Sequence, residues 1–203
     1  MSDAASRRRS IAVAGHTGDV DVARAGVADD DASVRATALG ALERLGVLDD
    51  DTLTTALTDD DATVRRRAAS IAATHHDVDL TGVLDDADPR VVEVAAWSCG
   101  EHESARDEIV ERLMSLGADA AEPLVRESAV AALGAIGDAR AIEVVIAACA
   151  DKPAIRRRAV LALAAFIDDP AHGARVDQTI DAALEDRDWQ VRQAAEDLRR
   201  AMS

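Results

Sequence analysis

The sequence predicts an all-α fold, a right-handed α-solenoid of about six helical-hairpin repeats. Three observations carry this prediction. A short motif recurs along the 203-residue chain at intervals of 27 to 36 residues, a period typical of stacked helical pairs. An amphipathic stripe with helical spacing follows the motif, and no segment alternates apolar and polar residues as a half-buried strand does.

The recurring motif consists of one or more aspartates, a β-branched anchor, an arginine and an alanine-rich run. The clear copies are anchored at Val34, Val64, Ile155 and Val191. Looser copies are anchored at Val125 and at Val91, where Val92 replaces the arginine. After the anchors, apolar residues recur at about +4, +7, +8 and +11, one stripe on a helix of about 3.6 residues per turn. These runs are the predicted inner helices.

Shorter amphipathic segments between the motif copies are the predicted outer helices. They lie near 20–28, 50–57, 78–85, 105–116, 139–149 and 174–185. A lone helix at 4–15 is expected to cap one end of the array, and a polar helix near 189–201 to close the other. The prediction is one domain over 1–203, with repeats near 19–46, 48–75, 78–101, 104–137, 138–167 and 171–201.

Residues suited to helix ends fall at the predicted boundaries. Aspartates at 29–31 and 59–61 can accept the free backbone N–H groups of a new first turn. The first turns of three inner helices carry a proline, a residue whose missing N–H costs nothing there, at Pro89, Pro123 and Pro153. Left-handed helix ends are expected at Gly46, Gly117 and Gly137.

The Asp, β-branched, Arg, Ala-rich pattern resembles the HEAT superfamily, in particular the HEAT-like repeats named after phycobilisome lyases. The resemblance covers essentially the whole chain and is clearest over 29–74 and 119–167. It implies the solenoid fold. It does not choose a function, because proteins sharing this unit include chromophore lyases, an iron-dependent hydroxylase, DNA-repair glycosylases and adaptors.

The charge of the chain is strongly acidic and unusual in its makeup. The formal net charge is -16, Lys152 is the only lysine, and aspartate greatly outnumbers glutamate. This resembles the proteome bias of extreme halophiles and indicates a haloarchaeal source, with an acidic mesophilic protein as the alternative. Net negative charge also argues against nucleic-acid binding, which depends on cationic contacts to phosphates.

The expected location is the cytoplasm. The run after Arg7, Arg8 and Arg9 is too short for a twin-arginine export signal, and no stretch approaches a membrane span. Cys99 and Cys149 are widely separated in apolar helical contexts, so free thiols are expected rather than a disulfide.

The sequence predicts neither a metal site nor a catalytic site, and therefore no cofactor. The hydroxylases of the superfamily use several His-Glu pairs, whereas this chain has only His102-Glu103, and neighbouring His75 and His76 lack the spacing that places two ligands on one helical face. The glycosylases rely on a cationic, aromatic-lined groove, which an aromatic fraction of 1% does not provide. We predict that the chain is not an enzyme.

The arginines of the motif are predicted to be structural. The resemblance implies that each pairs with an aspartate of its own or a neighbouring repeat and forms a ladder along the array. The predicted ladder is Arg35, Arg65, Arg126, Arg156 and Arg192.

The opposite face of the inner helices, at +2, +6 and +9 from each anchor, should line a concave groove. Trp and Arg are the residues most enriched among binding hot spots. The predicted partner-binding residues are therefore Arg66, Arg67, Trp97, Arg157, Arg158 and Leu161. Packing of Trp97 in the core of an irregular third repeat stays open as the alternative.

The predicted function is a non-catalytic scaffold or adaptor that binds a protein partner, with an acidic segment or helix as the expected ligand. Two alternatives remain, both from the resemblance alone. One is a subunit of a lyase or protein-modification enzyme, and the other an adaptor in a prokaryotic signalling or motility complex. The sequence predicts no nucleic-acid or membrane partner and does not determine the oligomeric state.

Overall fold

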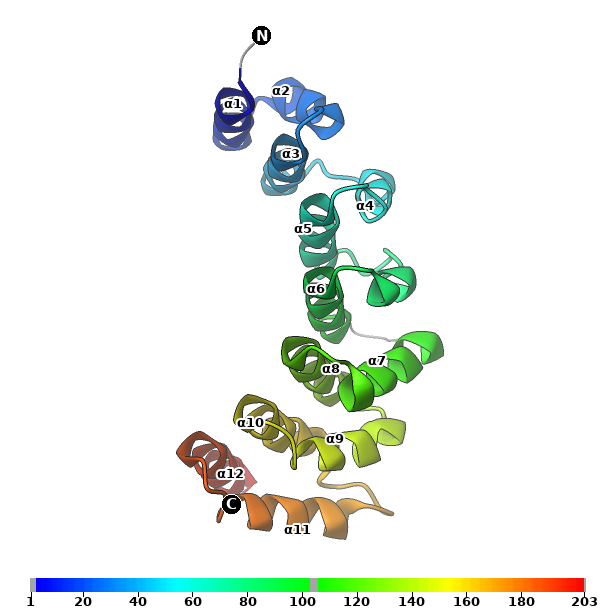
Figure 1. Cartoon of the computed structure of the whole chain (residues 1–203), viewed down its shortest axis with the longest axis vertical. Helices are drawn as coiled ribbons and strands as arrows, with labels where there is room; N and C mark the ends of the chain where they lie inside the picture. Colours follow the sequence, from blue (N-terminus) through cyan, green and yellow to red (C-terminus); the bar gives the residue numbers. More distant parts are fainter. Residues whose placement is uncertain (1–2, 103–105, 203) are drawn as a thin grey trace. The chain divides into compact units, whose positions relative to one another are not determined.

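The computed structural model describes residues 3–102 and 106–202, and every regular element in those ranges is a helix (Figure 1). The predicted fold class, an all-α solenoid, is confirmed. The chain divides into two compact units, residues 1–95 and 96–203. The prediction of a single domain stays a prediction.

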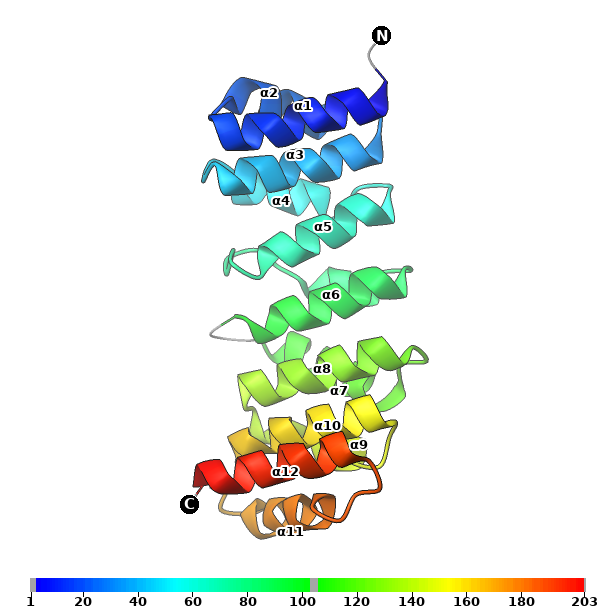
Figure 2. The same cartoon turned by 90° about the vertical axis from the view of Figure 1, so that its left-hand side faces the viewer.

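The first unit is built from short helical hairpins. Its inner layer contains α1 (Ala4–Thr17), α3 (Ala32–Arg44) and α5 (Ala62–Ala72), in which α3 packs against both neighbours. Figure 2 shows these three helices in one layer, with the outer helices behind. The outer elements are α2 (Val20–Ala25), the 3-10 turn η1 (Gly26–Ala28), α4 (Asp50–Ala56) and the 3-10 helix η2 (Thr81–Asp85).

The second unit repeats the scheme with longer outer helices. The division between the units falls within α6 (Pro89–Gly100). The other inner elements of the second unit are α8 (Pro123–Ile136), α10 (Pro153–Ala162) with η4 (Leu163–Phe166), and α12 (Trp189–Met202). The outer elements are α7 (Asp107–Asp119), η3 (Ala139–Ala141), α9 (Ile142–Ala148) and α11 (Gly173–Ala183).

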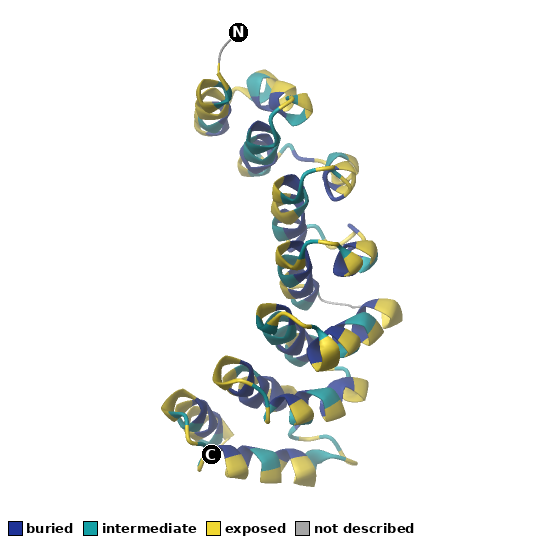
Figure 3. Cartoon of the chain, viewed as in Figure 1, coloured by how far each residue is buried: buried dark blue, intermediate teal, exposed yellow. Residues whose placement is uncertain are grey.

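Small residues on the apolar stripe let the inner helices approach closely. In each unit the predicted stripe is buried, and its alanines Ala38, Ala129 and Ala159 are 0% exposed (Figure 3). A Cβ on Gly134 of α8 would lie 2.4 Å from the Cβ of Ala162 on α10, so this crossing admits only glycine. Alanine-rich sequence thus produces a core with few large side chains.

The predicted helix ends are largely observed. Asp31 and Asp61 cap α3 and α5, accepting from backbone N–H groups at 2.9 and 2.7 Å. Pro89, Pro123 and Pro153 each begin a helix. Gly46 and Gly137 adopt positive φ, as does Gly18, which sequence reasoning did not single out.

Two local predictions were wrong. Gly117 does not end a helix in the left-handed conformation; it lies buried inside α7, where a Cβ would meet Val144 at 3.2 Å. Gly117 allows close packing between helices and does not form a turn. The outer helix expected at 78–85 is only the 3-10 segment Thr81–Asp85, because the third repeat has the shortest spacer of the array.

Candidate functional site

The arginine ladder consists of bidentate ion pairs between successive repeats. In each pair, Nε and Nη2 of the arginine donate to both carboxylate oxygens of an aspartate in the next repeat. The pairs are Arg35–Asp59, Arg65–Asp86, Arg126–Asp151 and Arg156–Asp186, with N···O distances of 2.6 to 3.0 Å.

The remaining donors of the ladder hold the turn that precedes each inner helix. Nη1 of Arg35 donates to the carbonyl of Asp29 at 2.9 Å, and Nη1 of Arg156 to that of Asp151 at 2.9 Å. Arg192, in the last repeat, donates to the carbonyl of Asp186 at 2.7 Å. The guanidiniums of the ladder are thus engaged within the fold, and their structural role stays a prediction.

The ladder begins one helix earlier than the sequence motif indicated. Arg7 of α1 donates to both carboxylate oxygens of Asp29 at 2.7 and 2.8 Å. The hydrogen bond from Arg7 lowers the pKa of Asp29 to about 2. The spacing of 22 residues from Arg7 to Asp29, close to the 24 and 21 of the next two pairs, was the available signal.

At one step of the ladder both partners are replaced. Val92 occupies the arginine position, and Ala120, whose carbonyl accepts from Arg126, occupies the aspartate position. A single replacement would leave a half-buried charge without its partner, which is more costly than removing both. The ladder therefore forms two runs, one in each unit.

A cleft of about 620 Å³ opens on the inner face of the first unit. Four arginines line it, from α1 (Arg8), α3 (Arg44) and α5 (Arg66 and Arg67), and we call it the arginine cleft. None of these four has an ion pair within the residues that the structure describes. The other lining residues are Ala12, His16, Ser33, Ala36, Thr37, Gly40, Thr63, Ser70 and Val94.

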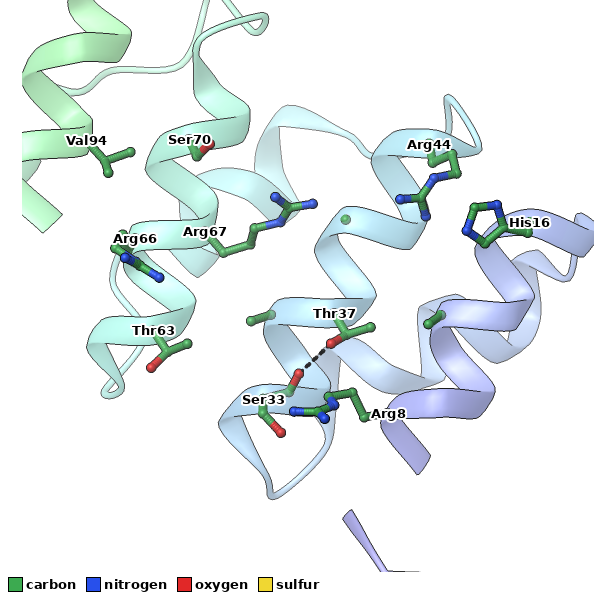
Figure 4. Close-up of a pocket in the computed structure, with 13 residues that line it drawn as sticks. Arg8, His16, Ser33, Thr37, Arg44, Thr63, Arg66, Arg67, Ser70 and Val94 are labelled. Carbon is green, nitrogen blue, oxygen red and sulfur yellow. Dashed lines mark hydrogen bonds between the residues drawn. The ribbon is translucent and has the colours of Figure 1, made fainter. Parts of the chain in front are cut away.

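Two helical glycines make room for the guanidiniums of the arginine cleft. A Cβ on Gly40 would lie 2.2 Å from Nη2 of Arg67, and a Cβ on Gly15 would lie 3.1 Å from Nη1 of Arg44. Figure 4 shows the side chains of Arg67 and Arg44 extending toward each other from α5 and α3. The two charges are thus seated against backbone rather than against carboxylates.

The second unit exposes two large apolar residues on its inner helices, Trp97 and Leu161. Trp97 of α6 is 44% exposed, while its neighbours Ala96 and Ser98 are 0% exposed. Leu161 of α10 is 36% exposed and lines, with Arg158, a shallow hollow of about 260 Å³. Trp97 therefore projects from the surface of its helix.

Arg157 and Arg158 differ in their surroundings. Arg157 is exposed, with no ion pair in the described part of the chain. Arg158 is half-buried and lies 3.9 Å from Glu127, and its Nε is buried without a hydrogen-bond partner within the described residues. At 3.9 Å the contact between Arg158 and Glu127 is too long for a hydrogen bond.

Sequence reasoning named Arg66 and Arg67 but missed Arg8, His16 and Arg44. Arg44 lies ten residues after its anchor, and Arg67 and Arg158 lie three residues after theirs. The exposed face of the inner helices is therefore centred about one residue later than the predicted +2, +6 and +9 positions. The residues on α1 had no signal, because this helix carries no anchor from which to count.

The described histidines form no group suited to a metal ion. His75 is bridged by Glu43 at 2.9 Å and Asp50 at 2.7 Å, and His172 contacts Asp169 at 2.9 Å. Within the described ranges, no three His, Cys, Asp or Glu side chains are grouped as metal ligands. Glu103 of the His102-Glu103 pair lies outside the described residues. Neither Cys99 nor Cys149 forms a disulfide.

Comparison with known proteins gives one partial family match. A family model of HEAT repeats matches residues 79–164. A search of curated proteins gives no match. Within 3–102 and 106–202, no helix is both long and apolar enough to cross a membrane.

Solved repeat proteins resemble the whole chain in fold. An engineered protein from the Northeast Structural Genomics Consortium superposes with a TM-score of 0.64 at 20% identity, covering 88% of this chain and 94% of that one. A designed armadillo repeat protein in complex with the peptide (KR)4 gives 0.59 at 16% identity, covering 96% and 98%. At such identities the likeness shows the fold alone, a solenoid of helical repeats.

Proposed function

We propose that this chain is a non-catalytic scaffold that binds a protein partner through the exposed face of its inner helices. The exposure of Trp97 carries the proposal. A tryptophan that is 44% exposed between two fully buried neighbours is a large apolar anchor, and such residues dominate binding energy when a partner covers them. Leu161 supplies a second apolar contact in the same unit.

The charge of this face indicates the chemistry of the partner. The designed armadillo protein is in complex with a basic peptide, whereas the faces described here present arginines: Arg66 and Arg67 in one unit, Arg157 and Arg158 in the other. Guanidiniums match carboxylates in a bidentate geometry. The expected ligand is therefore an acidic segment with apolar residues that cover Trp97 and Leu161.

The test is partner capture by variants of the full chain, purified at the salt concentration of the native host and analysed by mass spectrometry. Trp97→Ala should reduce capture roughly thirtyfold, because loss of a central anchor commonly costs about 2 kcal/mol or more. Charge reversal at Arg157 and Arg158 should also abolish capture. Helicity and melting temperature should change little, because none of the three side chains belongs to the buried core.

Trp189→Ala is the matched control, since Trp189 is also exposed but begins α12. It should leave capture intact. Unchanged capture by Trp97→Ala would contradict the proposal, as would a steep fall in its melting temperature, which would assign Trp97 to the core.

A further inference from the structure

We infer that the arginine cleft of the first unit is a binding site for a phosphate group. The inference deepens the proposed function in this unit and rests on its scaffold role, but it uses no residue of the second unit. Four observations support it: the charge of the lining, the number of free donors, the seating of the arginines and the size of the cleft.

The charge of the cleft lining is opposite in sign to the net charge of the chain. The formal net charge of the chain is -16, yet none of the 13 lining residues is aspartate or glutamate. The carboxylates of Asp31 and Asp61 accept hydrogen bonds from the lining residues Ser33 and Thr63, but they cap α3 and α5 and do not line the cleft. Positive charge without counter-charge in a concave site attracts and concentrates anions.

The donors in the cleft exceed what one carboxylate can accept. Four guanidiniums line the cleft, of which those of Arg67 and Arg44 extend toward each other. The hydroxyls of Thr63 and Ser70 make no hydrogen bond within the described residues, so they can also donate. The hydroxyls of Ser33 and Thr37 are already donating, to Asp31 and to a backbone carbonyl. A phosphate monoester has three terminal oxygens and nearly two negative charges at neutral pH, which suits this set better.

The seating of Arg67 and Arg44 against Gly40 and Gly15 limits their freedom before any ligand arrives. A side chain held near its bound position loses less conformational entropy on binding. No ion pair has to be broken first, because neither arginine has one in the described part of the chain. The side chains of Arg67 and Arg44 are therefore preorganised to bind an anion.

The size of the cleft, about 620 Å³, falls within the range of roughly 300 to 1,000 Å³ typical of small-molecule sites. Its open side would also admit a phosphorylated side chain of a protein. Both sources present the same phosphate group, so the chemistry of recognition is shared.

The experiment is calorimetric titration of the full chain in chloride buffer of constant ionic strength. The probes are inorganic phosphate, pyrophosphate and two alanine-flanked pentapeptides with phosphoserine or glutamate at the centre. Saturable one-to-one binding is expected, with the phosphopeptide at least about tenfold tighter than the glutamate peptide. A phosphopeptide tighter than pyrophosphate would assign the source to a protein, and the opposite order to a small phosphorylated compound.

Variants then locate the site. Arg67→Gln and Arg44→Gln should each weaken binding at least about tenfold. Arg9→Gln makes the same charge change next to Arg8 but outside the cleft, and should weaken it less than about twofold. Gly40→Ala should displace Arg67 and weaken binding without lowering the melting temperature, since alanine favours a helix more than glycine does.

Three results would overturn the inference: no saturable binding, equal affinity for the phosphoserine and glutamate peptides, or equal weakening by Arg9→Gln and Arg67→Gln. Partner capture that depends on Trp97 in the absence of phosphate binding would leave the proposed function standing and remove only this site.

Discussion

Removing one arginine of the ladder should destabilise the chain far more than removing the exposed arginine beside it. Arg156 is the most deeply buried member, with its side chain 6% exposed and that of Asp186 15% exposed. It donates at 2.8 Å to each oxygen of Asp186 and at 2.9 Å to the carbonyl of Asp151. Arg156→Ala would leave the carboxylate of Asp186 half-buried without its partner.

The magnitude follows from these contacts. Hydrogen bonds to charged groups contribute roughly 1.5–3 kcal/mol, and breaking a buried ion pair costs about 3–5 kcal/mol. Because Asp186 keeps some solvent contact, we expect a loss of about 3 kcal/mol for Arg156→Ala. The control Arg157→Ala, an exposed residue of the same helix, should cost about 0.5 kcal/mol or less.

The sequence of the chain suggests a double variant that removes both members of this ion pair. Its own ladder replaces one Arg–Asp pair by Val92 and Ala120, so Arg156→Val with Asp186→Ala copies a natural step. The double variant should be destabilised less than the sum of the single variants, by a coupling energy of about 2 kcal/mol. Urea midpoints at high salt, by circular dichroism, provide the measurement.

The structural role of the ladder would be refuted if Arg156→Ala cost no more than Arg157→Ala. Additive single variants would refute the pairing itself, because independent residues show no coupling.

Three further predictions concern the solution conditions. Because Arg7 lowers the pKa of Asp29 from 3.8 to about 2, the stability from this pair is present above pH 4 and lost as the pH falls toward 2. Arg7→Gln should therefore make the melting temperature depend less on pH between 4 and 2. Burial of His75 opposes its protonation, but hydrogen bonds to Glu43 and Asp50 outweigh this and raise its pKa above 6.5. The contribution of His75 to the free energy of unfolding should therefore be complete below pH 6.5 and lost as the pH rises through the raised pKa. His75→Gln should remove this pH dependence of the melting temperature. Transfer from about 1 M salt to dilute buffer should lower the melting temperature, because the screening length grows from about 3 Å to tens of Å; an unchanged value would contradict the halophilic interpretation.

The local features that the sequence predicted are those that depend on short spacing. The stripe after each anchor, the aspartate caps and the prolines at helix starts all act within one or two helical turns, and the structure confirms them. Gly117 shows the limit of such reasoning. A glycine near a helix end has the same local pattern whether it turns the chain or admits a neighbouring helix, and only the presence of Val144 distinguishes the two.

The sequence by itself determined the repeat, the phase of the inner helices and the ladder arginines, because a 3.6-residue stripe and a recurring Arg require no knowledge of distant contacts. Only the tertiary structure decided which arginines are neutralised and which are left for a ligand. Arg65 and Arg66 are adjacent, yet Arg65 holds Asp86 and Arg66 faces the arginine cleft. That difference arises because successive helical residues point about 100° apart, so one meets the next repeat and the other meets solvent. Arg8 and Arg44 likewise line one cleft only because α1 packs against α3.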